Sequence, residues 1–214
     1  MILFDKAALG IVERPDWFTY TGNTMKFFYN PRKAAQTAAF LVRLNGGRMD
    51  AFSLIKVLYL SDRRALAERG RPITGDVMVS MPHGPVLSRI YDEIKAPAEV
   101  QDESWSKHLK ARDENMVSLR EQNPASDELS DYERAILTET HSNYAHYGPM
   151  ELRAITHRLP EYVDPQGSSI PIDPVKILRE EGWSDEEIEE ALMSAREEIF
   201  LAGIANTATD KVRA

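Results

Sequence analysis

The chain has 214 residues, a net charge of −8, 43% hydrophobic residues and no cysteine. This length suits one domain with appendages, and the composition is that of an ordinary globular protein. The lack of cysteine excludes disulfides, thiolate chemistry and cysteine-ligated zinc, and the acidic balance argues against nucleic-acid binding, which needs clustered Lys and Arg. The first residues lack the pattern of a signal peptide, and no apolar run is long enough to cross a membrane. We therefore expect a soluble, cytoplasmic protein.

The N-terminal region contains an aromatic segment, WFTYTGNTMKFFY, at residues 17–29. Two aromatic and threonine-rich arms flank Gly22-Asn23, a pattern that predicts a β-hairpin. Aromatic side chains fall on both faces, so something must cover them. We expect the hairpin to pack on its own domain, and the alternative is an edge offered to a partner. The candidate partner-binding residues in this segment are Trp17, Phe18, Tyr20 and Phe27.

Two helices and a short strand are predicted next. Asn30-Pro31 has the form of a helix start, and Gly46-Gly47 ends this first helix. Asp50 is the expected cap of a second helix, which stops at Gly70 before a Pro. That second helix is apolar around much of its first half, so we expect it to be the central buried helix. A short strand is expected at residues 77–80.

The second half of the chain predicts one further hairpin and several helices. Residues 105–109 and 117–119 are strand candidates joined by the polar loop ARDEN. Capping boxes at Ser130 and Ser184 predict two helix starts, and short helices are expected after Gly148-Pro149 and around 174–180.

These elements predict a mainly α-helical fold, a compact helical domain with small β-hairpins. We divide the chain into an N-terminal aromatic hairpin extension (1–29), a helical domain (30–162) and a C-terminal helical extension (163–214). The acid-rich run 179–198 is most simply the solvated face of two short helices, and it could also attract a basic partner.

No catalytic, metal or cofactor site is predicted. His141 and His146 are five residues apart and would point about 140° apart on a helix, so they do not form a ligand pair. His157 could join them only through the tertiary fold. His83 lies in a loop without a Ser or acid at a recognisable spacing, and a turn histidine bonded to backbone is the simpler interpretation. The phosphate-binding patterns GxxxxGK and GxGxxG do not occur.

The remaining parts suit binding. The stretch 70–95 brackets a short strand and a turn with Gly and Pro, which predicts a stiff loop, and Met is a residue that adapts to varied partners. The candidate partner-binding residues in this stretch are Met78, Met81, Pro82, His83, Gly84 and Pro85.

Residues 54–95, which we call the signature segment, resemble the signature of the Panacea domain, also called the SocA-like antitoxin family. The matching residues are Lys56, Leu58, Tyr59, Leu60, Asp62, Gly70, Pro72, Ile73, Thr74, Gly75, Asp76, Met81, Gly84, Pro85, Val86, Tyr91 and Asp92. The later segment ELRAITHRLPEY, with Leu152, Thr156, His157 and Pro160, is similar to the family's second half. The resemblance runs from about Pro31 to Tyr162. We expect a structural scaffold from Lys56, Leu58, Tyr59, Asp62, Gly70, Pro72, Ile73, Thr74, Gly75, Asp76, Val86 and Tyr91.

The resemblance implies an antitoxin of a bacterial, phage or prophage toxin–antitoxin system that neutralises a cognate toxin by direct protein–protein binding. One alternative is a proteolytic adaptor that delivers the toxin to an AAA+ protease. A histidine-based hydrolase or metalloenzyme using His83, His141, His146 or His157 is the alternative from another class. We expect no cofactor, no nucleic-acid partner and no membrane partner.

Overall fold

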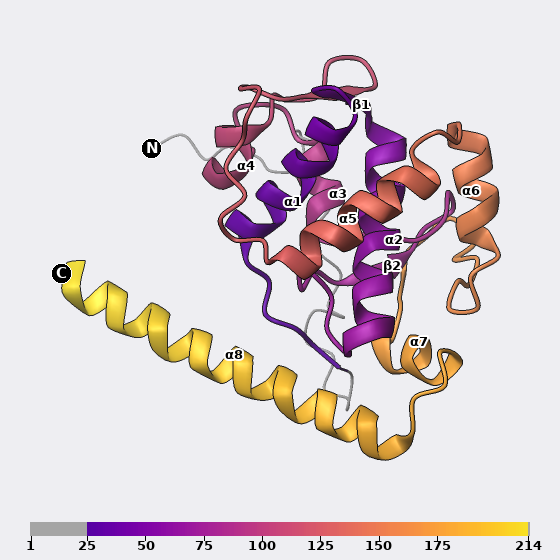
Figure 1. Ribbon diagram of the computed structural model, residues 1–214, viewed down its shortest axis with the longest axis vertical. Coiled ribbons are helices and arrows are strands. Elements are labelled where there is room, and N and C mark those ends of the chain that lie inside the picture. Colours follow the sequence, from indigo (N-terminus) through magenta and orange to yellow (C-terminus); the bar gives the residue numbers. More distant parts are fainter. Residues whose placement is uncertain (1–24, 214) are drawn as a thin grey trace, which may run out of the picture.

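The computed structural model describes residues 25–213, which form a mainly α-helical fold with small antiparallel strand pairs (Figure 1). The fold class predicted from the sequence is therefore confirmed. The helices are α1 (Pro31–Leu44), α2 (Ala51–Arg69), α3 (Ser88–Lys95), α4 (Glu103–His108), α5 (Asp131–Tyr144), α6 (Pro149–His157), α7 (Pro174–Glu180) and α8 (Asp185–Arg213). The strands are β1 (Arg48–Asp50), β2 (Met78–Ser80), β3 (Val86–Leu87), β4 (Met116–Ser118) and β5 (Ile170–Pro171). In this part of the chain no helix combines the length and the apolar character that a membrane span requires.

Helix α2 is the centre of the fold, as its sequence predicts. It packs against α1, α5, α6 and α7, so side chains around most of its circumference are buried. The helix begins where the Asp50 carboxylate accepts a hydrogen bond from the Ser53 N–H at 2.9 Å. It ends before Gly70, whose N–H donates to the Leu66 carbonyl.

The other helix starts also follow from local side chains. The Asn30 side chain accepts from the Lys33 N–H at the start of α1. Ser130 and Glu133 cap each other's backbone at the start of α5, and Ser184 and Glu187 do the same before α8. These side chains satisfy N–H groups that have no partner inside the helix, so each boundary is fixed locally.

Two small sheets hold the loops in place. Strand β1 pairs with β4, with Met49 opposite Val117. The second sheet has the order β3-β2-β5, in which Val79 faces Val86 on one side and Pro171 on the other. The β2–β3 connection, residues 81–85, is therefore held at both ends.

One of the two predicted hairpins is wrong in its first arm. Residues 103–108 form the helix α4, and its N-cap Asp102 accepts a hydrogen bond from the Ser104 N–H. Trp105 and His108 are buried, and α4 packs against α1. Residues 116–118 do form a strand, but its main partner is β1, and only an isolated bridge joins Leu109 to Leu119.

The predicted N-terminal hairpin lies only partly within the residues that the structure describes. Its first arm, with Trp17, Phe18 and Tyr20, lies outside the described residues. The second arm, Met25–Tyr29, belongs to no strand. Met25 is buried, and Phe27 and Tyr29 are half-buried against the core. The described part of this segment therefore packs on its own domain, and Phe27 is a weak candidate for partner binding.

Candidate functional site

Three signature-segment positions share one face of α2. Lys56, Tyr59 and Arg63 follow each other at intervals of three and four residues, so their side chains leave the helix on the same side. The Lys56 ammonium donates to the Pro85 carbonyl at 2.9 Å, and the Tyr59 hydroxyl donates to Glu161 Oε1 at 2.7 Å. Arg63 Nε donates to the same Glu161 oxygen at 2.8 Å. This face therefore ties the β2–β3 turn and the end of the family-like region to the central helix.

Lys56 is an unusually deep lysine. It is 1% exposed, its ammonium lies 5.2 Å from the centre of the Phe52 ring, and it donates a hydrogen bond to the Pro85 carbonyl. Burial lowers the pKa of Lys56 from 10.5 to about 7, and the nearby charge of Arg153 adds to this effect. The Lys56 side chain therefore holds the β2–β3 turn against α2 from inside the protein.

A second set of buried polar groups fixes the segment that precedes β2. The Asp62 carboxylate accepts hydrogen bonds from both the N–H and the hydroxyl of Thr74. The Asp76 carboxylate accepts from the Val77 N–H at 2.7 Å and from the Ile90 N–H at 2.9 Å. Asp76 thereby joins the start of β2 to the first turn of α3, whose preceding residue offers no capping side chain. Both carboxylates therefore connect backbone segments of the fold.

Gly84 allows the turn to approach α6 closely. A Cβ atom at this position would lie 2.7 Å from the Thr156 hydroxyl oxygen, 3.0 Å from the Lys56 ammonium and 3.1 Å from the His157 ring. These three groups come from α2 and α6, so the turn is clamped between two helices. Gly84 and Pro85 are both buried and cannot contact a partner directly, which corrects their assignment as partner-binding residues.

Asp62→Asn is expected to change how stability depends on pH. Burial raises the pKa of Asp62 from 3.8 to about 7, against the opposing effect of the Thr74 hydrogen bonds. The folded protein then holds this proton more tightly than the unfolded chain, so the stabilisation is full below about pH 4 and is lost as the pH rises to about 7. Burial also raises the pKa of Asp76, to about 6, so part of the slope remains in the variant.

Denaturant unfolding between pH 4.5 and 7.5 measures this effect. The free energy of unfolding of the wild type should fall relative to that of Asp62→Asn, by on the order of 1 kcal/mol per pH unit at most. Parallel pH profiles for the two proteins would show that Asp62 does not titrate in this window.

Residues 81–83 are the accessible part of the β2–β3 turn. Met81 and Pro82 are half-buried and His83 is exposed. Two of their carbonyl groups accept hydrogen bonds: the Tyr162 hydroxyl donates to Met81 O at 3.3 Å, and Arg153 donates to Pro82 O at 3.4 Å. Met78 points inward instead and is 3% exposed, which corrects its assignment as a partner-binding residue. It pairs with Leu87 across β2 and β3.

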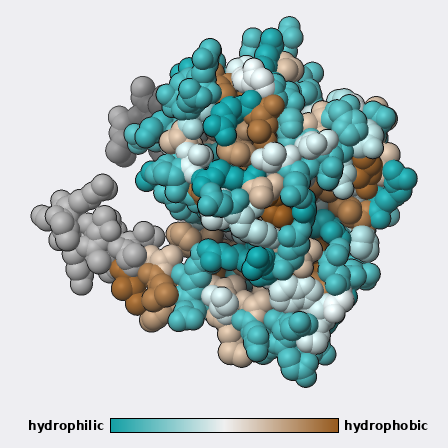
Figure 2. Space-filling view, viewed as in Figure 1, coloured by the Kyte–Doolittle hydropathy of each residue, from teal (hydrophilic) through white to brown (hydrophobic). Residues whose placement is uncertain are grey.

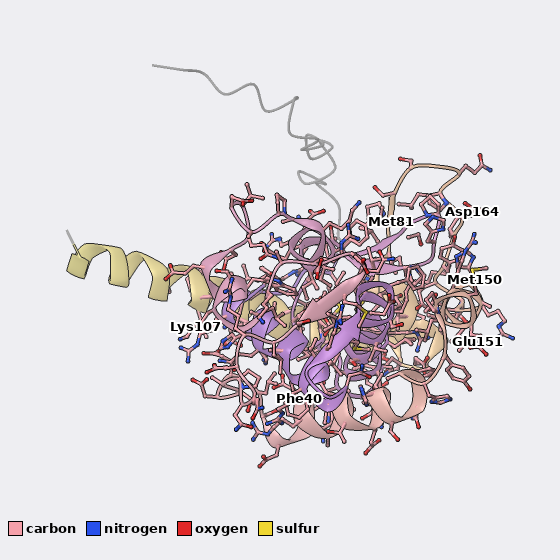
Figure 3. The ribbon with its side chains drawn as sticks, turned by 90° about the horizontal axis from the view of Figure 1, so that it is seen from above. Phe40, Met81, Lys107, Met150, Glu151 and Asp164 are labelled. Atoms are coloured by element: carbon pink, nitrogen blue, oxygen red, sulfur yellow. The ribbon has the colours of Figure 1, made fainter. Side chains whose placement is uncertain are left out.

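Helix α6 extends the accessible surface around the turn. Met150, in its first turn, is 72% exposed. Figure 3 shows Met150, Glu151 and Asp164 at one edge of the molecule, with Met81 further inward on the same side. The bonds to Met81 and Pro82 connect this edge to the turn. We define the turn surface as Met81, Pro82, His83, Met150 and Arg153. Sequence analysis did not find Met150, Arg153 or Glu161, because no local pattern distinguishes them.

Three of the candidate histidines contact residues of other types. His141 faces the Asn45 side chain at 3.2 Å, His146 lies against Tyr147, and His157 stacks on the Tyr162 ring at 4.3 Å. Burial lowers the pKa of His157, helped by the charges of Arg153 and Lys56. Among the residues that the structure describes, no cluster of three His, Asp or Glu side chains could hold a metal ion.

Comparison with known families decides the classification. The family model of the SocA-like antitoxin Panacea domain matches residues 54–161. The chain belongs to this family. The match covers just over half of the sequence and runs from the first turns of α2 to Glu161, so it includes both partners of the buried Tyr59–Glu161 bond.

This Panacea match confirms the resemblance drawn from the signature segment and supports an antitoxin-type role. No curated protein matches the chain, and no solved structure matches it. The three-part division of the chain stays a prediction. Strand β5 and the buried side chains of α7 and early α8 belong to the same core as the matched residues.

Proposed function

We propose that this Panacea protein is the antitoxin of a toxin–antitoxin pair and neutralises a cognate protein toxin by direct binding, without catalysis. The observation that carries the proposal is how the family signature is used. Lys56, Asp62 and Asp76 are buried. Lys56 bonds to the backbone of the β2–β3 turn, Asp62 to Thr74 before β2, and Asp76 to the first turn of α3. These buried groups fix the backbone on both sides of the accessible residues 81–83, which are therefore presented in a defined position.

The turn surface has the properties of a binding site. Strands β2 and β3 fix both ends of its loop, and hydrogen bonds from Arg153 and Tyr162 fix the loop's backbone. Ordering the loop on binding therefore costs little conformational entropy. The turn surface presents two exposed side chains, the apolar Met150 and the imidazole of His83. Methionine adapts its shape to irregular partner surfaces, which suits a domain that meets a protein toxin.

The double variant His83→Glu/Met150→Glu tests this surface. Both side chains are exposed, so the melting temperature should stay within a degree or two of the wild-type value. Two introduced carboxylates would be desolvated in the complex, and toxin binding should weaken by about 100-fold or more. The measurement is growth of cells that express the product of the adjacent reading frame together with either protein.

A control variant and a second readout complete this experiment. Val100→Glu places a carboxylate at another exposed apolar position, 54% accessible, in the loop after α3, and should leave neutralisation intact. Full neutralisation by the double variant would show that the turn surface does not bind the toxin. Toxin half-life in the same cells separates two modes of action: a blocking antitoxin leaves it unchanged, whereas a protease adaptor shortens it.

A further inference from the structure

The C-terminal helix α8 begins on the body of the protein and then leaves it. Trp183, just before the helix, donates from its indole N–H to the Ala67 carbonyl at 2.9 Å. Ile188, Leu192 and Ala195 bury one side of the first three turns. Farther along the helix, Glu198 forms an ion pair with Arg71 of the body. Figure 1 shows α8 running out along one side of the molecule, beyond the other helices that the structure describes.

This outer part of α8 is apolar and exposed. Phe200, Leu201 and Ile204 are 67%, 56% and 53% accessible, and Met193 is 54% accessible. Figure 2 shows a hydrophobic patch where α8 leaves the body. Met193, Phe200 and Ile204 are spaced by seven and four residues, so they form one stripe. At 100° per residue this stripe lies roughly 130° around the axis from the buried side.

The same outer stripe carries negative charge. Glu186, Glu190 and Glu197 fall within about 40° of it by the same helical geometry. All three are exposed. The outward face of α8, which we define as Glu186, Glu190, Met193, Glu197, Phe200 and Ile204, therefore combines an apolar stripe with an acidic flank.

We propose that the outward face of α8 is a second docking site for the toxin, which fits it with an apolar groove rimmed by Lys or Arg. This inference rests on the proposed function and adds a partner contact outside the turn surface. An amphipathic helix laid into a groove anchors through side chains at this spacing, with Phe200 as the aromatic anchor. The acidic flank selects a basic partner and accelerates its approach.

Charge also decides against a second copy of this chain as the occupant. Pairing two outward faces in parallel would bring Glu186, Glu190 and Glu197 of one chain beside the same residues of the other. Antiparallel pairing over the whole face would set Glu186 and Glu190 of one chain against the apolar Ile204 and Phe200 of the other, which would desolvate these carboxylates without a partner. A basic surface on another protein meets neither obstacle.

Binding of the purified full-length protein to the purified product of the adjacent reading frame tests the proposal. Phe200→Ser/Ile204→Ser should weaken the affinity by about 30-fold, the loss typical of an interface hot spot. Val100→Ser, at an equally exposed apolar site, should not change it. Glu190→Lys/Glu197→Lys should slow association by about tenfold at low salt, with a smaller effect at high salt, and Glu99→Lys is the matched charge control.

Each outcome decides between the two proposals. Equal affinity of the wild type and both α8 variants overturns the α8 inference and leaves the proposed function intact. Absence of binding by the wild type overturns the proposed function, and the α8 inference fails with it. Light scattering gives the third outcome: a concentration-dependent dimer that Phe200→Ser abolishes would assign the face to a second copy and overturn the toxin contact.

Discussion

Gly75→Ala is expected to lower the free energy of unfolding by about 3 to 5 kcal/mol, because two separate costs add. Gly75 has a φ of +70°, a left-handed conformation that costs an L-residue about 1 to 2 kcal/mol. A Cβ atom would also lie 2.7 Å from the Phe28 carbonyl carbon and closer still to its oxygen. Because these are backbone atoms, the segment before α1 has to move.

The matched control is Gly46→Ala. Gly46 has a φ of +80°, but a Cβ atom there would have no neighbour within 4 Å. This variant therefore carries the conformational cost alone and should lose about 1 to 2 kcal/mol. Denaturant unfolding of both variants gives the two values. Equal losses would show that the close approach of Phe28 to Gly75 does not stabilise the fold.

Glu161→Ala is expected to destabilise the protein by about 3 kcal/mol, the low end of the range for breaking a buried ion pair. One carboxylate oxygen accepts hydrogen bonds from both Tyr59 and Arg63, and the side chain is fully buried. Its removal leaves the Tyr59 hydroxyl unsatisfied in the core. Arg63 keeps a second carboxylate, Glu181, at 2.8 Å, which limits the loss.

Two variants show whether burial is the cause. Glu181→Ala removes the other partner of Arg63, but its side chain is 38% exposed, so the loss should be under about 1 kcal/mol. Glu161→Gln keeps an acceptor for Tyr59 and should fall between the two. Thermal or denaturant unfolding measures all three. If Glu161→Ala lowers the free energy of unfolding no more than Glu181→Ala does, the bonds of Glu161 to Tyr59 and Arg63 do not hold the end of the matched region to α2.

The predicted helix starts were confirmed because their signals are local. Asn30, Asp50 and Ser130 each bond to a backbone N–H three residues ahead, so the necessary partners lie within one turn of sequence. The central position of α2 could also be predicted, because its apolar residues surround the helix and only burial on all sides satisfies them.

The second hairpin was mispredicted because the pattern is ambiguous. Trp105 and Leu109 are four residues apart, and this spacing puts two side chains on one face of a strand and equally on one face of a helix. The cap at Asp102 favours the helix, and α1 provides the surface against which Trp105 is buried.

The candidate site could be predicted only in part. The signature segment predicted a scaffold role for Lys56 and Tyr59, but the partners of these residues are distant in sequence. Lys56 bonds to Pro85, 29 positions away, and Tyr59 bonds to Glu161, 102 positions away. Whether Met78 faces solvent or the core depends on the pairing of β2 with β3, which brings Leu87 beside it. Contacts between residues so distant in sequence cannot be predicted from the local sequence pattern.

The most direct test of the central claim, neutralisation by binding, is a titration of toxin activity with purified protein in the absence of protease. A binding antitoxin should remove activity in proportion to the amount added and reach completion at a fixed molar ratio. His83→Glu/Met150→Glu should need a large excess for the same effect. Complete inactivation of the toxin by a small fraction of an equivalent would mean that the protein acts catalytically, and would contradict the account.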